Sequence, residues 1–84
     1  MLEVRFFARL REALGRERVS LPLETPGLTV EGLLLALDAE IPGARAQLTV
    51  PGIRLAVNQA FVETEAFVLN PGDEIAFLPP VTGG

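Results

Sequence analysis

The residues with the clearest chemical potential stand at the end of the sequence, which reads Val81-Thr82-Gly83-Gly84. Residues without a Cβ fit a narrow channel and accept the backbone angles that such a channel imposes, so a carboxylate behind two glycines can enter another protein's active site. Pro79-Pro80 come directly before and favour a stiff, extended path. We expect residues 81–84 to be a flexible tail whose Gly84 carboxylate other enzymes activate and load. The alternative is a frayed, inert end.

The remaining residues offer little catalytic chemistry of their own. The chain has no cysteine and no histidine, which excludes the usual Cys/His zinc sites and the Ser-His and Cys-His nucleophile pairs. Asp73-Glu74 could perform acid–base or metal chemistry, but neighbouring acids after a turn are more typical of a solvated loop. There is no phosphate-binding glycine loop. We therefore expect the chain to bind no metal and no cofactor, and to depend on partners for the activation of its tail.

Charge and hydropathy narrow the class of partner. Seven Lys and Arg stand against eleven Asp and Glu, which gives a net charge of −4 and a pI of about 4.6. Nucleic-acid binding needs a basic stripe, so we expect no nucleic-acid partner. The acidic surface is either simply solvated or steers the chain toward basic partner enzymes. Because no run approaches the ~20 apolar residues of a membrane span and the start lacks a signal-peptide pattern, we expect a cytoplasmic protein without membrane contact.

Hydrophobic periodicity predicts the elements that must position the tail. Apolar residues alternate in several short segments, and in one longer segment they follow helical spacing. Thr29 is a suitable N-cap for that helix, and Pro42-Gly43 ends it. Residues 43–52 are expected to be irregular. The predicted elements are strands at 2–7, 19–23, 53–57, 61–62 and 75–78, and one helix at 30–41.

This order of elements indicates an α+β domain. One helix crossing a mixed sheet of about five strands fits the ubiquitin-like β-grasp fold. The first and last strands would then lie side by side in the middle of the sheet, with the helix on one face. We expect residues 1–80 to form the domain and 81–84 to form the tail.

Three large apolar residues break the pattern of the predicted strands. If the alternating residues of the first and last strands face the core, Phe7 and Leu78 face outward. Phe61 lies in a short strand beside a turn and could join them. Each could merely close an edge of the core. Together, near the exit of the tail, they would form a docking patch for a partner.

Several segments resemble one known family. The sequence is similar to the small subunits of molybdopterin synthase, the sulfur carriers of molybdenum cofactor synthesis. The resemblance spans the chain, is weakest around the helix and residues 42–52, and is most specific in the ending. The matching residues are Phe6-Phe7-Ala8, Arg11-Glu12, Gly15, Ala56-Val57-Asn58-Gln59, Pro71-Gly72-Asp73-Glu74, Ala76-Phe77 and Pro79-Pro80-Val81-Thr82-Gly83-Gly84.

The resemblance implies a β-grasp fold and a reaction cycle. An E1-like adenylating enzyme would use ATP to join AMP to Gly84. A sulfur donor, such as a cysteine desulfurase or rhodanese, would convert the adenylate into a thiocarboxylate (1-thioglycine). The tail would then enter the large catalytic subunit, in an expected heterotetramer, and give its sulfur to cyclic pyranopterin monophosphate (precursor Z) to build the molybdopterin dithiolene. The chain alone would not be catalytic. By position, Gly83 and Gly84 match the family's tail, and Phe7, Phe61 and Leu78 match its partner contacts.

Other functions stay open on the sequence. A sulfur carrier for thiamine thiazole synthesis also ends in Gly-Gly on a β-grasp domain. A ubiquitin-like protein modifier would use the same carboxylate to form an amide with lysine. A plain interaction domain would leave the tail inert. A free-standing enzyme is disfavoured, because histidine, cysteine and a nucleotide loop are all missing.

Overall fold

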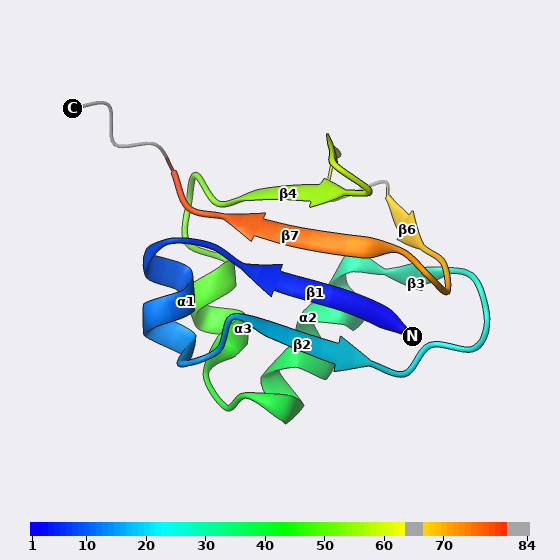
Figure 1. Ribbon diagram of the computed structural model, residues 1–84, viewed down its shortest axis with the longest axis horizontal. Helices are drawn as coiled ribbons and strands as arrows, with labels where there is room; N and C mark the ends of the chain where they lie inside the picture. Colours follow the sequence, from blue (N-terminus) through cyan, green and yellow to red (C-terminus); the bar gives the residue numbers. More distant parts are fainter. Residues whose placement is uncertain (64–66, 81–84) are drawn as a thin grey trace.

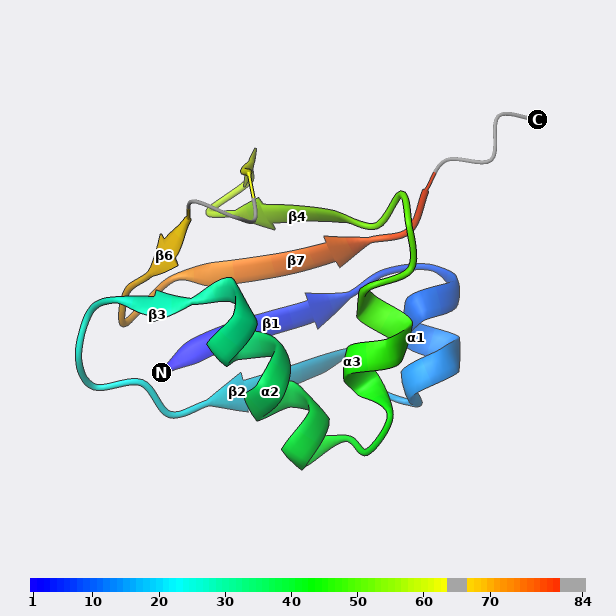
Figure 2. The same cartoon turned by 180° about the vertical axis from the view of Figure 1, so that it is seen from behind.

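A mixed β-sheet forms one layer of the molecule, and helices form the other (Figures 1 and 2). The computed structural model of the chain describes residues 1–63 and 67–80. The main sheet has five strands in the order β2-β1-β7-β4-β5, and a second sheet pairs β3 with β6. The predicted α+β class is confirmed. The strands are β1 (Leu2–Phe6), β2 (Arg18–Leu21), β3 (Leu28–Thr29), β4 (Arg54–Val57), β5 (Ala60–Phe61), β6 (Val68–Leu69) and β7 (Glu74–Leu78).

The first and last of these strands lie side by side at the centre of the sheet. β1 and β7 run parallel, with Val4 opposite Ile75 and Phe6 opposite Phe77. The Phe6 and Phe77 rings are stacked, with centroids 6.1 Å apart, a favourable offset geometry for aromatic pairs. β1 also pairs antiparallel with β2. The alternation of buried and exposed residues in β1 and β7 therefore divides the sheet into an inner and an outer face.

The longest helix covers the inner face. Helix α2 (Val30–Glu40) begins where the sequence predicts, because the Thr29 hydroxyl accepts a hydrogen bond of 3.0 Å from the N–H of Gly32. Its fully buried side chains include Leu33 and Leu37, which lie one turn apart and face the sheet. In the described residues the buried core is entirely apolar, so burial alone stabilises the contact between the layers.

Two short helices complete this layer, with α3 beside α2 and α1 beyond α3 (Figure 2). Helix α1 (Arg9–Leu14) ends at Gly15, which has a left-handed φ of 71°. Helix α3 (Ala44–Leu48) lies within the segment that was expected to be irregular, so that prediction is wrong. Ala44 and Leu48 are both buried and lie four residues apart, which is helical spacing, but one such pair is too short to stand out as a period.

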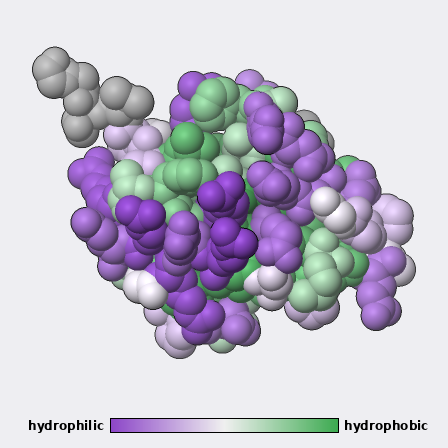
Figure 3. Space-filling model, in the orientation of Figure 1, coloured by the Kyte–Doolittle hydropathy of each residue, from purple (hydrophilic) through white to green (hydrophobic). Residues whose placement is uncertain are grey.

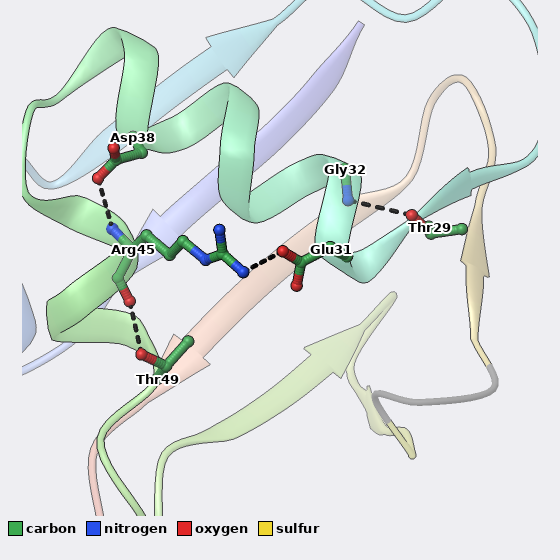
Figure 4. Close-up of polar contacts among 6 residues, drawn as sticks. All are labelled: Thr29, Glu31, Gly32, Asp38, Arg45 and Thr49. Atoms are coloured by element: carbon green, nitrogen blue, oxygen red, sulfur yellow. Dashed lines mark hydrogen bonds and ion pairs between the residues drawn. The ribbon is translucent and has the colours of Figure 1, made fainter.

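Arg45 connects α3 to α2 (Figure 4). Its backbone N–H donates to Oδ1 of Asp38 at 3.1 Å, and its guanidinium pairs with the Glu31 carboxylate. The Thr49 hydroxyl donates to the Arg45 carbonyl at 2.8 Å and satisfies the end of α3. Contacts that are distant in sequence therefore hold α3 in place. Within residues 1–63 and 67–80, no helix is both long and apolar enough to cross a membrane.

Removal of the α2 cap should be measurable. We expect Thr29→Ala to lower the free energy of unfolding by about 1 kcal/mol, because the N–H of Gly32 loses its partner. Urea unfolding of both proteins measures this. Thr25→Ala is the matched control, since Thr25 lies in the preceding exposed loop and should change stability by no more than about 0.5 kcal/mol. Equal losses in the two variants would contradict the capping role.

Candidate functional site

In the part of the chain that the structure describes, no helix covers the outer face of the main sheet (Figures 1 and 2). Strand alternation and the cross-strand register determine which side chains lie on it. Some are charged and some apolar, and together they form a continuous surface across all five strands. They are Arg18 and Ser20 of β2, Glu3 and Arg5 of β1 with Phe7 after it, Glu74, Ala76 and Leu78 of β7, Arg54 and Ala56 of β4, and Phe61 of β5.

Phe7 and Leu78 lie beside each other at one end of this face. The N–H of Phe7 donates to the Phe77 carbonyl at 3.3 Å, which continues the parallel ladder by one residue and sets Phe7 next to Leu78. Phe7 is 37% exposed, and Leu78 is partly buried. Both therefore lie on the outer face, where the sequence pattern predicts them.

Phe61 reaches the same face from β5. The turn at Asn58 and Gln59 has φ angles of 51° and 72°, as in the two-residue hairpin turns that match the twist of paired strands. This turn sets Phe61 opposite Ala56. The Phe61 side chain is 54% exposed, whereas Ala56 is buried. Phe61 is two strands away from Leu78. Phe7 and Leu78 therefore lie at one end of the surface and Phe61 lies at the other, so the three residues do not form a single cluster.

Arginines on the outer face stack on its aromatic rings. The Arg54 guanidinium carbon lies 3.6 Å from the centroid of Phe61, and Arg54 is also the cross-strand neighbour of Leu78. Arg54 therefore bridges the gap between Leu78 and Phe61. The Arg5 guanidinium carbon lies 5.3 Å from the Phe7 centroid. Each cation–π contact at an exposed site contributes about 0.5–1 kcal/mol.

The charge of this face differs from that of the chain. The outer face carries three arginines and two glutamates, whereas the whole chain has a net charge of −4. These residues are Arg5, Arg18, Arg54, Glu3 and Glu74. Figure 3 shows apolar surface near the ends toward which β1 and β7 point, bordered by hydrophilic surface. Such an apolar centre with a polar rim is typical of a protein interface. The acidic groups that could steer the chain toward a basic partner are not concentrated on this face.

The acids that were weighed as catalytic candidates have structural contacts. Asp73 accepts hydrogen bonds from the side-chain amide of Asn58 at 3.0 Å and from the N–H of Asn70 at 2.8 Å. The N–H of Glu74 donates to Asn58 Oδ1 at 3.0 Å. These bonds join the β4–β5 turn to the start of β7. Among the described residues, no three carboxylates gather into a metal-binding group.

The predicted tail begins beyond this surface. β7 ends at Leu78, and Pro79-Pro80 follow it as partly buried residues. The four residues predicted to carry the chemistry, Val81, Thr82, Gly83 and Gly84, lie outside the described residues. Their role, like the docking role of Phe7, Phe61 and Leu78, stays a prediction.

Sequence reasoning missed the two arginines that cover the aromatic rings. Arg5 and Arg54 each occupy an outward position of a predicted strand, so alternation alone could have placed them on the outer face. Their contacts with Phe7 and Phe61 depend on the strand register and on side-chain conformation, which the pattern does not contain.

Known proteins resemble this chain in sequence and in structure. The chain is 38% identical over 84 aligned residues, which cover 100% of each protein, to the molybdopterin synthase sulfur carrier subunit of Escherichia coli (strain K12). Among solved structures, it is similar to SAMP1 from Haloferax volcanii, with a TM-score of 0.83 and 27% identity over 99% of this chain and 98% of that one. It is also similar to a chain of the complex of subunits 1 and 2 of molybdopterin-converting factor from Helicobacter pylori 26695, with a TM-score of 0.66 and 29% identity over 99% and 97%.

The fold and the family expected from the sequence are therefore both confirmed. The structural neighbours have the ubiquitin-like β-grasp architecture of one mixed sheet crossed by a main helix. Curated relatives that match the full chain are sulfur carrier subunits of molybdopterin synthase. Residues 4–84 match the sequence model of the ThiS family, and the chain belongs to this family.

Proposed function

We propose that the chain carries sulfur as a thiocarboxylate on Gly84 and donates it, as the small subunit of a molybdopterin synthase, to cyclic pyranopterin monophosphate. The observation that carries this proposal is the end-to-end match with the E. coli carrier subunit. The exposed apolar surface at the end of β7 supports it, because that strand leads directly toward the Gly-Gly sequence.

Activation of the tail requires a partner enzyme. A carboxylate resists nucleophilic attack, so an oxygen of Gly84 would first attack the α-phosphorus of ATP in an E1-like enzyme and release pyrophosphate. The terminal sulfur of a cysteine persulfide on a cysteine desulfurase or rhodanese would then attack the carbonyl carbon, and AMP would leave with that oxygen. A thiol would cleave the resulting acyl disulfide by attack on the enzyme's sulfur, which leaves a mixed disulfide on the sulfur donor and the thiocarboxylate on the chain. The product is 1-thioglycine at position 84. In this scheme the chain binds neither ATP nor any other cofactor, and the catalytic side chains belong to its partners.

Delivery of the sulfur requires a second docking event. The loaded tail would enter the large subunit, in a heterotetramer, while the outer sheet face rests on the surface around the entrance. Sulfur transfer to precursor Z and hydrolysis would return the Gly84 carboxylate for another cycle. The similar H. pylori structure is a complex of two subunits of molybdopterin-converting factor, which supports a paired mode of action. These partners indicate that the chain works in the cytoplasm.

The loading of Gly84 can be measured by mass. We expect the intact mass to rise by about 16 Da after incubation with ATP, an activating enzyme and a sulfur source, because one oxygen is replaced by sulfur. Deletion of Gly84 should abolish the rise and leave thermal unfolding unchanged, since the core of the described residues ends at Phe77. A wild-type chain that never gains this mass would contradict the carrier function.

A protein modifier is the second candidate. The similarity to SAMP1, a small archaeal modifier protein, and the 32% identity to small archaeal modifier protein 3 of Haloferax volcanii favour it. The same incubation, extended to a mixture of acceptor proteins, separates the two functions. Amide bonds between Gly84 and acceptor lysines would identify a modifier. Sulfur transfer to precursor Z in the presence of a large subunit, without such bonds, would identify a carrier.

The outer face should contribute most of the docking energy. We expect Phe7→Ala and Phe61→Ala each to raise the Kd for the large subunit by about 10- to 100-fold, because large aromatic residues that become buried in an interface are often hot spots. Isothermal titration calorimetry measures the change.

Leu35→Ala is the matched control for both variants. Leu35 is 52% exposed and lies on α2, in the layer opposite the outer face. Its truncation removes exposed apolar surface without touching the proposed interface and should leave the Kd unchanged. Equal effects of Leu35→Ala and Phe61→Ala would count against docking through the sheet.

A further inference from the structure

A tight turn lies next to the point where the last strand ends. The N–H of Ile53 donates to the Val50 carbonyl at 3.2 Å and closes a four-residue turn with Pro51 and Gly52 at its centre. Gly52 has a φ of 92°. Proline second and a positive-φ glycine third are typical of a type II turn.

The strand register places this turn beside Pro80, the residue that precedes the tail. β4 and β7 are antiparallel, with Arg54 opposite Leu78. Continuation of this register sets Gly52 opposite Pro80. Pro79 and Pro80 have no N–H to donate, so the ladder cannot continue through their hydrogen bonds. Beyond Leu78 the chain is therefore directed by the restricted φ angles of the two prolines and by packing against the turn.

The contact between Gly52 and Pro80 leaves no space for a side chain. A Cβ built on Gly52 would lie 2.8 Å from Cβ and 3.2 Å from Cγ of Pro80. Pro80 is partly buried and also lines a groove of about 550 Å³ with Val50 and Ile53 from the same turn. The Pro80 ring therefore packs on the turn, and its position depends on the absence of a side chain at Gly52.

Other glycines in the described residues have the same backbone conformation without this contact. Gly43 and Gly72 have φ angles of 92° and 90°, and a Cβ on either would meet nothing within 4 Å. The backbone angle alone explains why glycine occupies positions 43 and 72. Gly52 has a second constraint, which is the close approach of the residue that precedes the tail.

We propose that Gly52 is a positioning residue that sets the direction in which the tail leaves the domain. The inference rests on the proposed loading of Gly84. Leu78 of the docking face is only two residues before Pro80, so the Gly52 contact fixes the start of the tail relative to that face. When the outer face docks on a partner, this geometry sets the direction from which the tail approaches the partner's active site. A side chain at residue 52 would displace the Pro80 ring, and a misplacement of about 1 Å can lower a rate by about 100-fold.

Gly52→Ala tests the proposal, with Gly43→Ala and Gly72→Ala as matched controls. All three variants place a Cβ on a backbone with φ near 90°, so each should lose thermal stability through backbone strain, and only Gly52→Ala also displaces the Pro80 ring. We expect only Gly52→Ala to lower the kcat of tail adenylation, by about tenfold or more, with KM for the carrier within about twofold of wild type, because the docking face is unchanged. ATP–pyrophosphate exchange by the activating enzyme measures both constants.

A second variant separates steric displacement from turn strain. Pro80→Gly removes the Cβ and Cγ atoms that a side chain at residue 52 would strike. In the Pro80→Gly background, Gly52→Ala should therefore cost no more in kcat than Gly43→Ala does. A Gly52→Ala effect that persists in this background, or that equals the effect of Gly43→Ala in the wild-type background, would overturn the positioning role.

The contact itself can be observed without any partner. In the free wild-type chain, we expect nuclear Overhauser effects between the Gly52 α-protons and the Pro80 ring protons, and their absence would overturn the inference whatever the kinetics show. A wild-type chain that shows this contact but is never adenylated would instead overturn the proposed function, and the positioning role with it.

Discussion

The parallel pairing of β1 with β7 is the constraint on which the rest of the structure depends. It brings two strands from opposite ends of the sequence into the middle of one sheet, where Phe6 and Phe77 stack over the core. β7 is flanked on both sides by hydrogen-bonded partners, β1 and β4. The strand that leads to the Gly-Gly sequence is therefore held at the centre of the sheet rather than at an edge.

The two faces of the sheet have separate tasks as a result. The inner face supplies stability, because α2 buries Leu33 and Leu37 against it and the described core contains no polar side chain. Because the inner face supplies the core, the side chains of the outer face need not pack against the rest of the domain. They can present apolar groups to a partner. This division explains how a chain of 84 residues, whose core is necessarily small, still leaves aromatic residues exposed.

Local pattern predicted much of the fold, and the failures share a physical cause. Alternation located β1 and β7, and the Thr29 cap marked the start of α2, because each of these signals is contained in a few adjacent residues. α3 was missed because its position depends on Arg45 contacting Glu31 and Asp38 of a different helix. Within the candidate site, the outward direction of Phe7 and Leu78 followed from alternation. The contact of Gly52 with Pro80 depends on a register between distant strands, which no local pattern contains.

The stacking of Arg54 on Phe61 has a consequence for the behaviour of the free chain. An exposed aromatic ring on a flat sheet invites self-association, and a layer of guanidinium charge over it repels a second copy of the same face. The same contact restricts the rotation of the ring before any partner arrives, so less side-chain entropy is lost on docking. Arg54 thus opposes self-association of the free chain and also reduces the entropy that Phe61 loses when a different protein docks on this face.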